Sequence, residues 1–242
     1  MLDESNSQIL VDLLNSTFKV SSKGNRLLIL LGCLGDFDSM EYIEFIANNL
    51  DYLKEKDIDV YIIGIGDNKS KKRFIEHTKL PQEFISVIDS PKVFNNIGLL
   101  LGSNYKLNPR IKMLLMCMGF NSKGTLKEVL RGYTGDKFAK SIFKEEDLIK
   151  IGTLIKFRGS IFNLINKKDC LRPFELATKR LVNLIEVITH WNTYYPNEEY
   201  LTQRGATFLL NNDDELVYSF YSKGILNYCE NKYSPLFFAD LI

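Results

Sequence analysis

The feature that most constrains the fold is an apolar run, residues 27–34, that ends at a glycine and an acidic turn. Asp36 and Asp38 form this turn, and a helical pattern of apolar residues begins at Ser39. A strand that is apolar throughout is typical of a parallel sheet with both faces covered. The free N–H groups and the dipole of a helix N-terminus stabilise an anion. The strand–helix junction is therefore the first candidate site. Helix capping by the same Asp and Ser side chains is the alternative.

Two further apolar segments, residues 58–66 and 84–89, have the length and composition of buried strands. Helical patterns follow each of the three strands, over residues 39–55, 69–79 and 91–101. This alternation of strand and helix predicts a parallel α/β sheet.

The remaining segments are expected to be mainly helical. Residues 1–24 contain a short amphipathic pattern, and residues 173–195 form the strongest helical pattern in the chain, with Pro173 at its first position. Residues 206–210 and 215–221 flank a turn and predict a β-hairpin. We expect the tail, residues 223–242, to pack on the core.

The charge balance argues against a nucleic-acid-binding protein. The chain has 31 Lys and Arg against 30 Asp and Glu, a net charge of +1, whereas such proteins usually carry a basic surplus. No apolar run reaches the roughly 18 residues of a membrane span, so no membrane association is expected. The first residues are acidic and do not resemble a secretory signal. The expected location is cytoplasmic.

The four cysteines are widely dispersed along the chain, and no two of them form a CxxC motif. With only two histidines in the chain, no metal site is expected, and no cofactor motif is present. Reduced thiols are the plain interpretation of dispersed cysteines in a cytosolic chain. The cysteines are Cys33, Cys117, Cys170 and Cys229.

Four segments resemble the peroxiredoxin (AhpC/TSA) branch of the thioredoxin fold, and more closely the peroxiredoxin-like subgroup of photosynthetic bacteria. They are residues 32–42, 124–136, 172–191 and 201–210. The resemblance implies an α/β fold with a thioredoxin-like central sheet, flanking helices and a large helical insertion. It also implies a thiol-dependent antioxidant oxidoreductase that uses a thioredoxin-like reductant.

On this resemblance we divide the chain into four parts. The N-terminal helical extension covers residues 1–24. The thioredoxin-like core covers 25–102 and 203–222, and the helical insertion 103–202. The C-terminal tail is 223–242. The long helix of the insertion is a candidate for packing the insertion against the sheet, or for a homodimer interface.

The family motif Pro-x-x-x-Thr/Ser-x-x-Cys falls on Gly32, Asp36 and Ser39, so the proline, the threonine and the peroxidatic cysteine are all replaced. Arg204 matches the late arginine that holds the thiolate in the family. A serine hydroxyl is far less acidic than a thiol and cannot form a sulfenic acid. The resemblance therefore implies the family's fold and its role for Arg204 in this chain, but it does not imply the peroxidatic nucleophile.

Two hypotheses about function remain open. In the first, another thiol performs the redox chemistry. Cys33 lies at the end of the first strand and is a displaced candidate, while Cys170 follows Lys167 and Lys168 in a loop and is the cysteine most expected to be exposed. In the second, the chain is a catalytically silent binding or scaffold module, in which an aspartate–Arg204 salt bridge replaces the thiolate–arginine pair.

Overall fold

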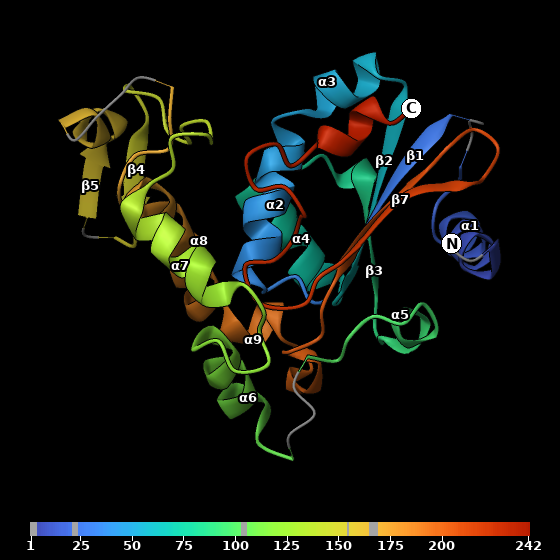
Figure 1. Cartoon of the computed structure of the whole chain (residues 1–242). Helices are drawn as coiled ribbons and strands as arrows, with labels where there is room; N and C mark the ends of the chain where they lie inside the picture. The colour runs from blue at the N-terminus through green and yellow to red at the C-terminus, as the bar shows by residue number, and fades with distance from the viewer. Residues whose placement is uncertain (1–3, 21–23, 103–105, 154, 165–168) are drawn as a thin grey trace.

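The computed structural model describes residues 4–20, 24–102, 106–153, 155–164 and 169–242. Its centre is a five-stranded sheet in the order β3-β2-β1-β6-β7, flanked by helices (Figure 1). β1, β2 and β3 run parallel, whereas β6 pairs antiparallel with β1 and with β7. This mixed sheet confirms the predicted thioredoxin-like α/β class. The strands are β1 (Asn25–Leu31), β2 (Ile58–Ile65), β3 (Ile85–Ile88), β6 (Ala206–Leu210) and β7 (Leu216–Tyr221).

Alternate side chains of β1 face two separate apolar layers. Leu27, Ile29 and Leu31 pack with α2 (Phe37–Ala47), α4 (Asn68–Thr78) and α8 (Glu175–Thr189). Leu28 and Leu30 pack on the other face with α1 (Glu4–Thr17) and α5 (Lys92–Asn96), as Figure 1 shows. Both faces of the central strand are therefore covered, which explains why its sequence is apolar throughout.

The helix expected over residues 39–55 is two helices. α2 begins at Phe37, with Asp36 as its N-cap, and ends at Ala47, and α3 (Leu50–Glu55) follows. Asn49 separates them: its φ of −122° is not helical, and its side chain donates to the Phe45 carbonyl at 2.7 Å. Asparagine competes in this way for backbone hydrogen bonds, so it favours helix ends over helix interiors.

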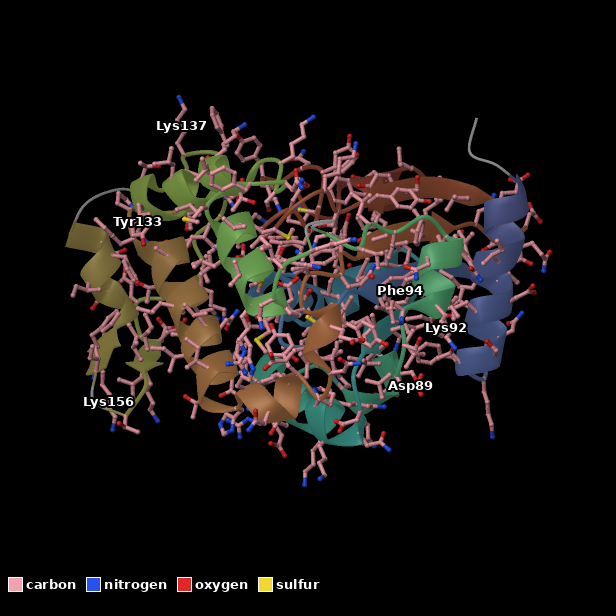
Figure 2. The ribbon with its side chains drawn as sticks, turned by 90° about the horizontal axis from the view of Figure 1, so that it is seen from below. Asp89, Lys92, Phe94, Tyr133, Lys137 and Lys156 are labelled. Carbon is pink, nitrogen blue, oxygen red and sulfur yellow. The ribbon has the colours of Figure 1, made fainter. Side chains whose placement is uncertain are left out.

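The segment between β3 and β6 is not entirely helical, which corrects the prediction for residues 103–202. It contains a two-stranded hairpin, β4 (Leu148–Ile151) and β5 (Ile155–Arg158), beyond α7 (Thr125–Thr134) and α8 (Figure 1). Each strand has four residues and only Ile149 is buried, so no clear alternation marks them. Tyr133 of α7 and Lys156 of β5 lie at the end of the molecule opposite α1 (Figure 2).

The long helix predicted over residues 173–195 is shorter and is interrupted. α8 starts at Glu175, because Phe174 has a positive φ of 64°, so Pro173 lies outside the helix. The chain leaves helical geometry at His190 and continues as α9 (Trp191–Tyr194). The helix expected over residues 91–101 is likewise only α5, which Gly98 follows with φ of 80°.

The other described helices connect and cover these layers. The tail is anchored by Ile225, Leu226 and Phe238, which are buried. Among the described residues, no helix has the length and apolar character that a membrane crossing needs. The remaining elements are α6 (Pro109–Cys117), η1 (Gln82–Phe84), η2 (Gly159–Leu164), η3 (Glu198–Tyr200) and η4 (Phe237–Asp240).

Candidate functional site

The junction between β1 and α2 brings Asp36 against Arg204, which lies 168 positions later in the sequence. Arg204 Nη2 lies 3.3 Å from Asp36 Oδ2, and both side chains are at most 4% exposed. Asp36 occupies the N-cap position but, within the described chain, its side chain makes no capping hydrogen bond. Its carboxyl is turned to Arg204 instead. Asp38, one of the side chains that the capping alternative offers for this helix, lies in its first turn and not at the N-cap.

The loop before β6 positions Arg204 from the opposite side. Its backbone N–H donates to the Leu100 carbonyl at 2.9 Å, and its Nε donates to the Thr202 carbonyl at 3.0 Å. Burial alone would lower the pKa of Arg204, but the charges of Asp36 and Asp38 outweigh burial and raise it. The guanidinium is thus a fixed positive charge at the junction.

Asp38 ties the junction to the tail of the chain. Its Oδ2 accepts a hydrogen bond from the Leu226 N–H at 2.6 Å. The Oδ1 atoms of Asp36 and Asp38 are buried, and neither has a hydrogen-bond partner among the described residues. Two buried carboxyls therefore face one guanidinium. Burial, followed by repulsion from Asp38, raises the pKa of Asp36 despite the opposing charge of Arg204.

Cys33 lies beside this charged cluster but is sealed from solvent. Its side chain is buried, and burial together with the charge of Asp36 raises the pKa of the thiol, with Arg204 opposing. The thiolate is the reactive form of cysteine, so a raised pKa makes Cys33 a weak nucleophile. Tyr195 closes the junction over it: the Tyr195 hydroxyl donates to the Gly35 carbonyl at 2.6 Å.

Sequence reasoning missed Tyr195 as a junction residue. In the sequence Tyr195 is one more apolar position of a long helix, and only the break at His190 turns it toward Gly35. A Cβ added at Gly35 would lie 2.6 Å from the Tyr195 ring, so these two positions fit each other.

Ser39 faces a small cavity beneath the junction. The cavity has a volume of about 20 Å³ and is lined by Asp36, Asp38, Ser39, Tyr42 and Thr207 among others. About 10–15 Å³ is the minimum for one water molecule, so this cavity has no room for an organic hydroperoxide. The serine hydroxyl is therefore near Asp36 and Asp38 but not accessible to a sizeable substrate.

Gly32, where the family motif has proline, is in close contact with the strand that leads to Arg204. A Cβ at Gly32 would lie 1.9 Å from the Gln203 carbonyl oxygen. No residue with a side chain fits here without movement of the backbone. The missing proline is therefore coupled to the placement of Arg204.

With this geometry established, the chain can be compared with known protein families. The profile of the family described as AhpC/TSA antioxidant enzyme matches residues 45–224. The chain belongs to the AhpC/TSA family. The match begins inside α2, so residues 32–39 of the junction lie outside it. No curated protein and no solved structure matches the chain.

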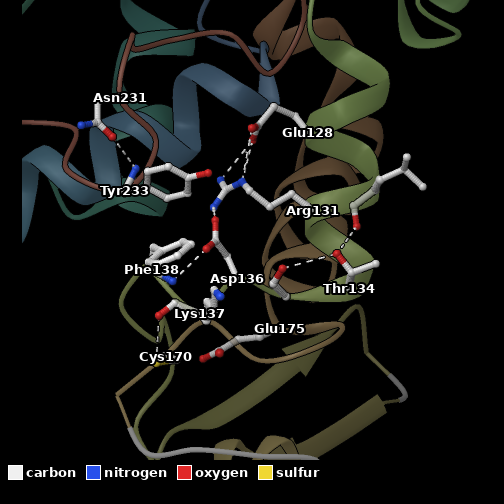
Figure 3. Close-up of polar contacts among 12 residues, drawn as sticks. Glu128, Arg131, Thr134, Asp136, Lys137, Phe138, Cys170, Glu175, Asn231 and Tyr233 are labelled. Atoms are coloured by element: carbon white, nitrogen blue, oxygen red, sulfur yellow. Dashed lines mark hydrogen bonds and ion pairs between the residues drawn. The ribbon is translucent and has the colours of Figure 1, made fainter.

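In this AhpC/TSA family member, none of the other three cysteines is a reactive thiol of the junction. All four cysteines, each within the described residues, are free. Burial raises the pKa of Cys117 to about 11 and that of Cys229 to about 12. Cys170 is half-buried and its Sγ donates to the Lys137 carbonyl at 3.3 Å (Figure 3). Lys167 and Lys168, expected to place positive charge near Cys170, lie outside the described residues.

The described residues also contain no group of three or more His, Cys, Asp or Glu side chains arranged to hold a metal ion. The chemical content of the site is thus one guanidinium, two carboxyls, one hydroxyl and one buried thiol. This set can hold a proton and a fixed ion pair, but it offers no exposed nucleophile in the folded state.

Proposed function

We propose that this AhpC/TSA family member is a binding module that has kept the fold and lost the thiol peroxidase chemistry of the junction. The observation that supports the proposal is the Asp36–Arg204 pair, buried at 3.3 Å. In the family, as the resemblance implies, this arginine holds the peroxidatic thiolate. Here a carboxyl of the chain itself lies against the guanidinium as an ion pair, without a hydrogen bond to Arg204 Nη2 from the described residues, so a substrate or thiolate would have to displace this carboxyl.

Burial gives a second, independent support. A peroxidatic thiol must be ionised and reachable, yet Cys33 is only 3% exposed and its thiol pKa is raised. Ser39, at the peroxidatic position, is 7% exposed and cannot form a sulfenic acid. Peroxide reduction by Cys33 would require the junction to open, and Ser39 cannot perform it in any conformation.

The proposal is tested by treating the reduced protein with limiting hydrogen peroxide and an excess of thioredoxin system, and by mapping all four cysteines by mass spectrometry. We expect no peroxide consumption above a sample without protein, and no sulfenic acid or disulfide at any cysteine. Catalytic turnover, or stoichiometric oxidation of one cysteine at low peroxide, contradicts the binding-module proposal.

A second candidate function is peroxide reduction by Cys33, as an antioxidant enzyme with a thioredoxin-like thiol reductant. One observation favours it: Arg204 lies near enough to Cys33 for its charge to oppose the rise in the thiol pKa. The thiolate would attack the peroxide O–O bond, giving a sulfenic acid and water or alcohol, and the dithiol reductant would restore the thiol. If the wild-type protein consumes peroxide, Cys33→Ser should abolish this, while Cys229→Ser should not.

We also propose that the chain belongs to the subgroup of photosynthetic bacteria, has a cytoplasmic location and forms a homodimer. We further propose that it is divided into a core at 25–102 and 203–222 and an insertion at 103–202. The structural fact that bears on the division is a buried ion cluster between the two parts. In it, Arg180 of α8 binds Glu41 of α2 at 2.7 Å and Glu128 of α7 at 3.2 Å.

A further inference from the structure

A second cavity lies between α7, α8 and the tail. Its volume is about 230 Å³. Three helices and one loop contribute to its wall, and most of the wall is aliphatic or aromatic. Its lining includes Cys117 from α6, Val129 and Tyr133 from α7, Leu181 and Leu184 from α8, and Leu226 from the tail.

The wall contributed by the tail is fixed by hydrogen bonds. The Ile225 N–H donates to the Ser122 hydroxyl at 2.7 Å, and the Thr125 hydroxyl donates to the Ile225 carbonyl at 2.8 Å. Leu226 has a positive φ of 60°, which is costly for a residue with a branched side chain, and its N–H is held by Asp38. A cavity with walls tied in this way is preformed, which reduces the entropy lost on binding a ligand.

The charged groups of the wall are already neutralised. Arg180, the cation of the lining, donates to both Glu41 oxygens, to the Glu128 carboxylate and to the Glu128 carbonyl. An anionic ligand would therefore have to compete with two buried carboxylates for this guanidinium. A neutral ligand meets no such competition and gains the burial of apolar surface.

The volume sets the size of the ligand. A closed cavity of about 150 Å³ lined by aliphatic and aromatic side chains binds benzene. This pocket is open to solvent beside Tyr133, Leu181 and Leu184, which are 53%, 42% and 38% exposed, and its volume of about 230 Å³ suits a fused two-ring aromatic or a short aliphatic chain. We propose that the pocket between α7, α8 and residues 225–226 binds a small neutral apolar molecule of this size. The inference rests on the binding role proposed above, and names the site and the class of ligand.

Binding is tested with 1-fluoronaphthalene, a neutral two-ring probe observed by ¹⁹F NMR on the full-length protein. We expect its resonance to shift and broaden with the wild-type chain. Ala177→Phe and Leu184→Trp place bulk in the pocket and should each weaken binding by about tenfold or more, since even one methylene group changes pocket binding by this order. Leu126→Trp is the matched control, because Leu126 is 58% exposed on α7 and lies outside the pocket lining.

Thiol labelling gives a second measurement on the unmodified chain. Cys117 lines the pocket, whereas Cys170 is half-buried elsewhere. Saturating naphthalene should slow the modification of Cys117 by N-ethylmaleimide at least about threefold and leave the rate at Cys170 unchanged, because only Cys117 loses access. Peptide mass spectrometry resolves the two cysteines in one sample.

Three results overturn the pocket assignment. One is a wild-type ¹⁹F resonance that does not change. Another is equal binding by the wild type and by two folded pocket variants. The third is a dimer, seen by sedimentation, in which a second copy covers the pocket and excludes the probe. Peroxide consumption, measured on the same samples, separates the two proposals. A protein that neither binds the probe nor consumes peroxide refutes the pocket proposal alone. A protein that binds the probe and also consumes peroxide refutes only the proposal that the thiol chemistry is lost.

Discussion

Asp36 determines the character of the junction because it brings a second negative charge into a space with one guanidinium. The Asp36 and Asp38 carboxyls are buried, and Arg204 can balance only one of them. A pair of close carboxyls resolves this by keeping a proton, as the raised pKa of Asp36 indicates. Burial and the second carboxyl thus favour the protonated form of Asp36 at the place where, as the resemblance implies, a peroxidase would carry a thiolate.

The raised pKa of Asp36 makes the stability of the folded state depend on pH, with a definite sign. The folded state binds more protons than the unfolded state above the ordinary Asp pKa of about 3.9. The contribution of Asp36 to the unfolding free energy should therefore fall as pH rises from about 4, by up to about 1.4 kcal/mol per unit for one proton, until the raised pKa of Asp36 is passed. The lowered pKa values of Glu41, Glu175 and Glu186 act with the opposite sign, so this contribution is read as the difference between the wild type and Asp36→Asn. Asp36→Asn should remove this slope in urea titrations at several pH values.

The control for this measurement is Asp51→Asn, on an exposed position of α3. It should leave the wild-type slope intact. A wild-type curve that rises between pH 4 and 7 while the Asp36→Asn curve coincides with it would contradict the account of the carboxyl pair.

The same cluster predicts what happens when the missing thiol is restored. In Ser39→Cys the introduced thiol should remain protonated at pH 7, because Asp36 keeps Arg204 occupied in a buried site. Adding Asp36→Thr frees the guanidinium and should accelerate iodoacetamide labelling of the introduced thiol at pH 7 by about tenfold, which corresponds to one pKa unit. Peptide-resolved mass spectrometry provides the rate, with Cys170 as internal reference. Equal rates in the two variants would mean that Asp36 does not control the site.

At the scale of the elements, the site depends on how closely β1 passes the loop before β6. The added Cβ at Gly32 would lie 1.9 Å from the Gln203 carbonyl oxygen, and at Gly205 it would lie 2.2 Å from that of Leu30. Glycine at both positions lets the two segments approach, and this approach places Arg204 against Asp36. The elements hold the ion pair through their backbones as well as through side chains.

Gly32→Ala should therefore lower the unfolding free energy by about 1–3 kcal/mol, the usual cost of overpacking, because the backbone at Gln203 must move. It should also disturb the Asp36–Arg204 pair. Gly98→Ala is the comparison, since its added Cβ meets no atom within 4 Å and its cost comes only from its φ of 80°. Urea unfolding gives the free energies, and a Gly32→Ala chain as stable as the wild type would refute the tight contact.

At the scale of the whole molecule, the regular sequence patterns predicted the sheet, whereas the contacts that build the site depend on irregular backbone that leaves no pattern. Apolar runs and a turn were enough to predict β1, β2, β3 and the β6–β7 hairpin, since strands covered on both faces must be apolar. The apolar run that ends at the acidic turn of Asp36 and Asp38 also located the junction between β1 and α2. What the sequence could not show were contacts set by backbone breaks: Tyr195 on Gly35 after the break at His190, and Leu226 on Asp38 through a positive φ.

The short hairpin β4–β5 was missed for a related reason. Four-residue strands with one buried side chain leave no periodic signal, and their pairing depends on the loop that joins them. The pocket could not be foreseen either, because it is a space left between α7, α8 and the tail and has no sequence pattern of its own.

The ion cluster of Arg180 joins these parts into one molecule, and its removal tests how strongly. Arg180, Glu41 and Glu128 come from α8, α2 and α7, and each side chain is at most 9% exposed. Arg131 extends the cluster to Asp136 at 3.6 Å (Figure 3). Arg180→Met leaves Glu41 buried without its guanidinium partner, while Glu128 keeps Arg131 at 3.0 Å, so the unfolding free energy should fall by about 3–5 kcal/mol. Urea unfolding followed by far-UV circular dichroism measures the loss.

Two further variants separate charge from packing. Arg110→Met removes a guanidinium that is 61% exposed and paired with Glu198, and it should change the unfolding midpoint little. Arg180→Met combined with Glu41→Leu should recover part of the lost unfolding free energy, because two apolar side chains replace a buried carboxylate that has no cation. If the double variant is as unstable as Arg180→Met alone, the cost lies in the packing of Arg180 and not in the buried charge of Glu41. If Arg180→Met unfolds at the wild-type midpoint, α7 and α8 are held to the sheet by apolar contacts alone.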